Sequence, residues 1–336
     1  MLRRVCVAAS IALMAACSSN SANPFTTLTK APSADAVLLF ASGSWSADPG
    51  QPRELFALNI DGTKPEQLTS CATATPACDF VQLAPSPDRN RLVAIRTTPD
   101  AAAGATTLYF MDLARGAEKV IFENRRVENV DYSPDGSFIL YTAVPTGTQT
   151  AAEDLFYSSP DGTGEQNLTN TTDFRERSPR VDPNATTAVY EGIDSTGVGR
   201  IYLFSQTKLT TGPEGGAALP DTPYVVGADA DPVISPDGLS VAFRRLTGVG
   251  NGGLGTWDLM TLRADGKSDP VVLATGPLFR GAPDWSAKGI VFVETDVAAD
   301  RSDLVVLSAN GASRTVLRTE PAGYRMGAPR WLPAGS

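Results

Sequence analysis

The sequence predicts an all-β protein, a six-bladed β-propeller of four-stranded antiparallel blades. Two observations lead to this prediction: a turn followed by a strand recurs six times, and a second column of strands recurs in step with it. A third observation agrees, because 25 prolines and 30 glycines interrupt the 336 residues too often for long helices. Long repeats that each contain several short strands are typical of propeller blades.

The recurring turn is clearest as Ser-Pro-Asp-Gly at 133–136 and 235–238, each followed by an apolar strand. Proline fixes φ at the second position of such a turn, and Asp-Gly supplies the remaining turn geometry. The proline column falls at positions 87, 134, 183, 236, 287 and 333, with alanine at 287, so neighbouring copies lie 46 to 53 residues apart.

The second column consists of short apolar strands. They are expected at 55–58, 108–111, 155–157, 201–204, 259–262 and 304–307. The chain ends complement each other, because the last copy, at Trp331, supplies only a first strand and the first copy, 36–41, lacks one. Pairing of the N- and C-terminal strands would complete one blade, close the ring and remove exposed sheet edges. The propeller is expected to span residues 34–336.

Residues 1–16 have the pattern of a signal peptide. Two arginines precede a mostly apolar stretch, 5–16, which is too short to span a bilayer as a helix. The tetrapeptide Met-Ala-Ala-Cys resembles the bacterial lipobox, so Cys17 is predicted to be the lipidated first residue of the mature chain. An ordinary secretory signal is the alternative. Small, polar and proline residues predict a lipidated N-terminus and flexible tether over 17–33.

Composition excludes several function classes. Without residues 1–16, 26 basic residues (28 − 2) face 37 acidic ones, a net charge of −11, so nucleic acid is not an expected partner. The chain has no histidine, which removes the Ser-His-Asp and Cys-His arrangements and the commonest metal ligand. No catalytic residue, metal site or cofactor is therefore predicted. Cys71 and Cys78 are close in sequence in an exported chain, so we expect a disulfide between them.

Four motifs follow one another in a recognisable order. They are Ser-Pro-Asp-Gly at 133–136, Asp-Leu-Phe at 154–156, Asp-Gly at 161–162 and Asn-Leu-Thr at 167–169. This pattern resembles the TolB-type or PD40 (WD40-like) propeller repeat, although the TolB family carries an α/β domain before its propeller. The resemblance implies a scaffold or sensor that binds a protein or peptide of the cell envelope. The lipid anchor alone would hold it to a membrane: the outer membrane, facing the periplasm, in a Gram-negative host, or otherwise the outer face of the plasma membrane.

The connections that lead into the inner strands carry more charge than simple loops need. In propellers of this kind they surround the axial opening on one face, and the Pro-Asp-Gly turns lie on the other. We expect a partner-binding site at this mouth for a carboxylate, a phosphate or an acidic or C-terminal peptide, because the planar arginine fork suits such groups. Its predicted residues are Arg126, Arg175, Arg280, Arg325, Phe279 and Tyr324. Alternatively, these arginines pair with Glu128, Glu176 or Asp229 and hold neighbouring blades together.

A second function class stays open. It is a propeller hydrolase or lyase that uses carboxylates or a bound divalent cation at the axial mouth. No two carboxylates stand out as a glycosidase pair. The Asp-Ala-Asp sequence at 229–231 is too small a ligand set for calcium on its own. A binding protein, not an enzyme, is therefore the leading prediction.

Overall fold

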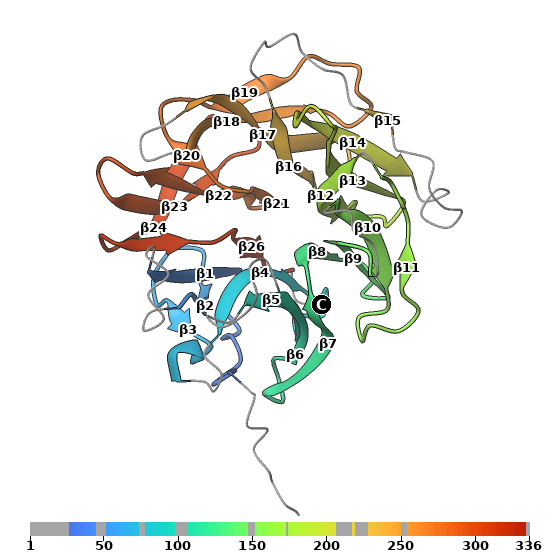
Figure 1. The fold of residues 1–336 in the computed structure, drawn as a ribbon. Coiled ribbons are helices and arrows are strands. Elements are labelled where there is room, and N and C mark those ends of the chain that lie inside the picture. Colours follow the sequence, from blue (N-terminus) through green and yellow to red (C-terminus); the bar gives the residue numbers. More distant parts are fainter. Residues whose placement is uncertain are drawn as a thin grey trace, which may run out of the picture.

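In a computed structural model, the chain forms six antiparallel sheets arranged as blades around a central axis (Figure 1). This arrangement confirms the predicted six-bladed propeller. The structure describes residues 27–44, 52–73, 78–97, 106–146, 152–172, 174–205, 217–218, 228–249 and 254–333. Within these ranges there is one short 3-10 helix, η1 at Cys71–Thr73, and no helix is long and apolar enough to cross a membrane.

Each blade runs from an inner strand beside the axis to an outer strand at the rim. Blade 1 contains β25 (Tyr324–Met326), β26 (Arg330–Trp331), β1 (Leu38–Ser44), β2 (Glu54–Leu58) and β3 (Glu66–Gln67). Blade 2 contains β4 (Asp79–Pro85), β5 (Arg91–Thr97), β6 (Thr106–Asp112) and β7 (Ala117–Arg125). Blade 3 contains β8 (Val127–Tyr132), β9 (Ile139–Ala143), β10 (Asp154–Ser158) and β11 (Gln166–Asn167).

The other three blades follow the same order from axis to rim. Blade 4 contains β12 (Arg175–Val181), β13 (Thr187–Ile193), β14 (Gly199–Ser205) and β15 (Ala217–Ala218). Blade 5 contains β16 (Asp229–Ile234), β17 (Ser240–Val249), β18 (Gly255–Arg263) and β19 (Val271–Ala274). Blade 6 contains β20 (Phe279–Arg280), β21 (Asp284–Ser286), β22 (Gly289–Asp296), β23 (Arg301–Leu307) and β24 (Arg314–Glu320).

Blade 1 joins the two ends of the chain. The last strands, β25 and β26, both pair antiparallel with β1, and Leu38 lies opposite Trp331. The predicted closure by terminal strands is therefore confirmed. Apolar side chains fill the space between neighbouring blades: Leu38 and Phe40 of blade 1, for example, pack in one buried cluster with Val291 and Leu304 of blade 6. Burial of this surface is the main force that holds the blades side by side.

The repeated motifs make repeated hydrogen bonds. In the Ser-Pro-Asp-Gly turn, the Ser133 hydroxyl donates to Asp135 at 2.7 Å and accepts the amide of Phe138 at 3.0 Å. The Leu-Thr motif continues the pairing of a short outer strand, since Thr169 Oγ1 accepts the Leu155 amide at 3.0 Å. These bonds satisfy backbone groups that would otherwise be left without partners where turns and strands end.

The N-terminal part of the described chain packs on the propeller before residue 34. Thr27 and Leu28 are buried, and both of their amides donate to Glu118 Oε1, at 2.7 and 3.0 Å. Nearby, Cys71 and Cys78 form the predicted disulfide, with a Cα–Cα distance of 4.9 Å. The predicted signal peptide and Cys17 lie outside the described residues.

Candidate site at the axial mouth

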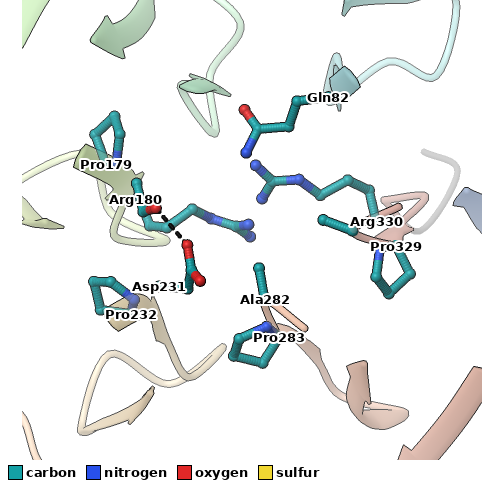
Figure 2. A pocket seen from close by; sticks show the side chains of 11 residues that line it. Gln82, Pro179, Arg180, Asp231, Pro232, Ala282, Pro283, Pro329 and Arg330 are labelled. Carbon is teal, nitrogen blue, oxygen red and sulfur yellow. Dashed lines mark hydrogen bonds between the residues drawn. The ribbon is translucent and has the colours of Figure 1, made fainter. Parts of the chain in front are cut away.

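The axial channel is closed halfway along. The space left there is about 10 Å³, and Gln82, Arg180 and Arg330 extend towards the axis from β4, β12 and β26 (Figure 2). A gap of this size holds no more than one water molecule. Among the described residues, the two ends of the channel are therefore distinct cavities.

Two arginines and two aspartates close the channel. Arg180 contacts Asp284 and lies 3.5 Å from Asp131, while Arg330 lies 3.6 Å from Asp131 and 3.8 Å from Asp284. Burial raises the pKa of both aspartates, and the Arg180 guanidinium opposes that shift. Two cations balance two anions here, so this closure is a structural ion-pair cluster and offers no free charge to a ligand.

A larger cavity opens where the connections between blades meet, and we call it the connection-side mouth. Its volume is about 770 Å³, within the range of small-molecule and peptide sites. Strands β8, β12, β13, β16, β17 and β18 contribute to its wall. Its charged and aromatic lining residues are Arg126, Glu128, Arg177, Glu191, Asp231, Arg244 and Trp257.

One side of the mouth is a network of two arginines and two glutamates. Arg126 lies 2.7 Å from Glu128 and 2.8 Å from Glu153. Arg177 shares the same partners, at 3.1 Å and 3.4 Å. Burial and the Glu128 carboxylate raise the pKa of Glu153, and the two guanidinium groups oppose the shift. Glu153 Oε2 is buried without a hydrogen-bond partner among the described residues.

The opposite side of the mouth is centred on Arg244. Its guanidinium lies 4.0 Å from the centre of the Trp257 ring and pairs with Asp231 at 2.5 Å. Asp231 has φ of 49° at a bulge in the pairing of β16 with β17, a conformation that non-glycine residues adopt only at a cost. Burial and the nearby Asp231 raise the pKa of Glu191 to about 8, while Arg244 and Arg177 oppose the shift.

Of the residues predicted for the mouth, Arg126 lines the cavity and the other five do not. The Arg126 side chain is 37% exposed. Arg175 is half-buried on β12, two residues before Arg177. The Arg280 guanidinium is buried against Glu294 at 3.0 Å, and Arg325 pairs with Asp300 at 2.7 Å. Of the pairings named in the alternative, Arg126 with Glu128 is present, whereas Arg280 and Arg325 pair with other carboxylates.

The two predicted aromatic residues also lie outside the lining of the mouth in the described structure. Phe279 sits behind Arg244, with its ring centre 5.5 Å from that guanidinium. Tyr324 is on β25, opposite Ser44 of β1. Four residues of the mouth were not predicted from the sequence, because no motif marks them. Arg177, Glu191 and Arg244 lie within strands β12, β13 and β17, and Glu153 lies in the connection before β10.

The far end of the channel opens on the face of the Ser-Pro-Asp-Gly turns, and we call it the turn-side mouth. Its volume is about 370 Å³, and its wall includes six prolines and two tryptophans. The prolines of the repeat column that line it are Pro87, Pro134, Pro183, Pro236 and Pro333. This cavity offers a ligand fewer charged groups than the connection-side mouth, because its four buried charged groups belong to the channel closure.

No family model and no curated protein matches the chain by sequence. Solved structures match its fold. TolB from Acinetobacter baumannii has a TM-score of 0.67 at 18% identity, over 90% of this chain and 68% of that one. The fold is that of a TolB-like propeller. A chain of a nidogen/laminin complex gives a TM-score of 0.60 at 13% identity, over 89% and 99% of the two chains.

Enzymes are also among the solved structures of similar fold. Oligogalacturonate lyase from Vibrio parahaemolyticus gives a TM-score of 0.51 at 12% identity, over 79% of this chain and 72% of that one. At such identities the likeness establishes architecture alone, because propellers serve many unrelated functions. Function has to be argued from the residues of the connection-side mouth.

Proposed function

We propose that the protein is an exported, lipid-anchored propeller of the bacterial cell envelope, a scaffold or sensor that binds a protein or peptide. Its binding site is the connection-side mouth. The observation that carries the proposal is a cavity of about 770 Å³ with a closed floor, whose wall combines partly exposed charges with Trp257. A recessed site with convergent polar groups and an aromatic residue is the usual form of a recognition site.

Two further points support binding at this end of the channel. Arg126 and Arg177 keep 37% and 29% of their side chains exposed, so a partner can reach them although both are paired. The solved structures of similar fold include TolB and a chain from a protein–protein complex. Lipidation of Cys17 would hold the propeller at the outer membrane, facing the periplasm, or at the outer face of the plasma membrane.

Photo-crosslinking in the native cell tests this proposal. A photoreactive amino acid replaces Arg126 at the connection-side mouth, and in a matched strain it replaces Lys288, which lines the turn-side mouth. We expect a discrete protein adduct from position 126 and none of the same mass from position 288. Equal adducts from both positions, or adducts from 288 alone, would contradict the proposed site.

A second candidate is a hydrolase or lyase acting at the same mouth. Glu191, with a pKa of about 8, lies near Asp231, which is paired with Arg244, and two carboxyl groups in different environments can divide acid and base roles. The shared fold with oligogalacturonate lyase suggests an acidic oligosaccharide as the first substrate to try. New reducing ends or unsaturated products that vanish in Glu191→Gln would establish this activity.

A further inference from the structure

The carboxyl groups of the connection-side mouth outnumber its guanidinium groups. Three guanidinium groups, those of Arg126, Arg177 and Arg244, face four carboxyl groups. Arg126 and Arg177 are both held between Glu128 and Glu153, and Arg244 is held by Asp231. The fourth carboxyl group, that of Glu191, has no ion pair among the described residues and is 9% exposed at the cavity wall.

The surroundings of Glu191 fix its position without neutralising it. The charged groups that face it are Asp231 on β16, Arg244 on β17 and Arg177 on β12. On its own sheet, β14 approaches so closely that a Cβ on Gly199 would lie 2.9 Å from Glu191 Oε1. Glycine at this position therefore leaves room for the carboxyl group beside the cavity.

This arrangement disfavours the binding of an anionic ligand. Its carboxylate or phosphate would have to displace Glu128 and Glu153 from arginines that they already bind, and Glu153 is fully buried with one oxygen unpaired. A cation meets the opposite situation, since it can pair with the Glu191 carboxyl group, which forms no ion pair among the described residues and ionises when the cation binds. These pairings favour a cationic ligand, whereas an anionic ligand was expected from the sequence.

We propose that the connection-side mouth receives a cationic group of its partner, an ammonium or guanidinium of a peptide, which binds between Glu191 and Asp231. This inference rests on the proposed function and adds the chemical class of the ligand. Because a cation stabilises the carboxylate form, binding near neutral pH moves one proton from the Glu191 carboxyl group to the buffer. The ligand keeps its own charge. The reactants are the Glu191 carboxyl group and the cation, and the products are a carboxylate–cation pair and one free proton, so charge and atoms balance.

Calorimetry with defined peptides tests the inference. The probes are a tri-lysine peptide and a tri-glutamate peptide, both with acetylated and amidated ends, titrated at pH 7 in two buffers of different ionisation enthalpy. The variant is Glu191→Gln. The matched control is Asp35→Asn, which makes the same carboxyl-to-amide change at an exposed position outside the mouth. Thermal midpoints confirm that both variants fold.

We expect the lysine peptide to bind the wild type and Asp35→Asn with release of about one proton. Glu191→Gln should weaken that binding about tenfold or more and release none. Tighter binding of the glutamate peptide, equal binding by Glu191→Gln, or no binding of the lysine peptide would overturn the inference. The proposed function would then still stand if position 126 crosslinks a partner, because that experiment does not depend on the partner's charge.

Discussion

Arginine side chains of this propeller differ in burial, and the difference separates their roles. Arg280 is 3% exposed. It donates to Glu294 at 3.0 Å and to the backbone carbonyls of Trp257 and Thr275 at 2.7 and 2.8 Å, and so joins blade 6 to blade 5. Arg126 has carboxylate partners too, but more than a third of it faces the mouth. Exposure, together with pairing, identifies the arginine that a ligand can reach.

Replacing Arg280 should therefore cost stability. In Arg280→Ala, the carbonyls of Trp257, Thr275 and Gly276 lose a donor, and among the described residues Glu294 keeps its contact with Arg314. We expect a loss of about 3 kcal/mol in the free energy of unfolding, measured by urea denaturation. Arg115→Ala is the matched control, because that side chain is 84% exposed, and its change should stay within about 0.5 kcal/mol. Equal stability of the two variants would show that Arg280 does not join the blades.

At the scale of elements, the turn motif explains which residues recur. The last turn residue adopts positive φ in four copies: 74° at Gly136 and at Gly238, 61° at Arg89, and 54° at Ala185 in the diverged copy Asp-Pro-Asn-Ala. In each case its amide donates to the first residue of the turn. Glycine is favoured there because an L-residue pays a steric penalty in this region.

Opposite substitutions at two of these turns should have opposite effects. Gly136→Ala places a Cβ 3.5 Å from Pro87, an ordinary contact, so its cost comes from φ and should be about 1 kcal/mol. Ala185→Gly relieves the same strain and should stabilise by up to about 1 kcal/mol. Thermal midpoints of the two variants provide the measurement. A destabilised Ala185→Gly would mean that the turn is not strained.

These turns also show why the fold was predictable and the site was not. Turn and strand recur with a fixed order, so six blades and their closure follow from the sequence. Whether a residue lines the mouth depends on the face of the sheet to which its side chain points and on its position along the strand. Arg175 and Arg177 look alike in sequence, but only Arg177 lines the cavity. Glu153 is buried and directly precedes Asp154, whose position recurs in the repeats. No sequence pattern distinguishes the role of Glu153.

At the scale of the whole molecule, the last residues of the chain close both the ring and the channel. Strand β26 pairs with β1, and Arg330 on the same strand donates to the carbonyls of Leu83 and Val130 at 3.0 and 3.1 Å. Arg330 thereby connects blade 1 with blades 2 and 3 across the axis. The floor of the connection-side mouth consequently depends on closure of the ring.

Removal of residues 324–336 should open the ring. The truncated chain loses β25 and β26, so β1 becomes an exposed edge strand whose Leu38, Leu39 and Phe40 are buried in the intact protein. An unpaired apolar edge recruits other chains. We expect loss of amide protection over 38–44 by hydrogen exchange, together with higher oligomers in size-exclusion chromatography.

Arg330→Met is the matched comparison for this truncation, because it removes the contacts across the axis but leaves both strands in place. We expect this variant to keep the oligomeric state of the intact protein and its protection over 38–44, with a lower thermal midpoint, since two backbone carbonyls and two aspartates lose a buried cation. If the truncated chain also kept that oligomeric state with β1 protected, the ring would not depend on strand pairing between the termini. Oligomers from Arg330→Met, in contrast, would place the closure in the axial ion pairs instead of the terminal strands.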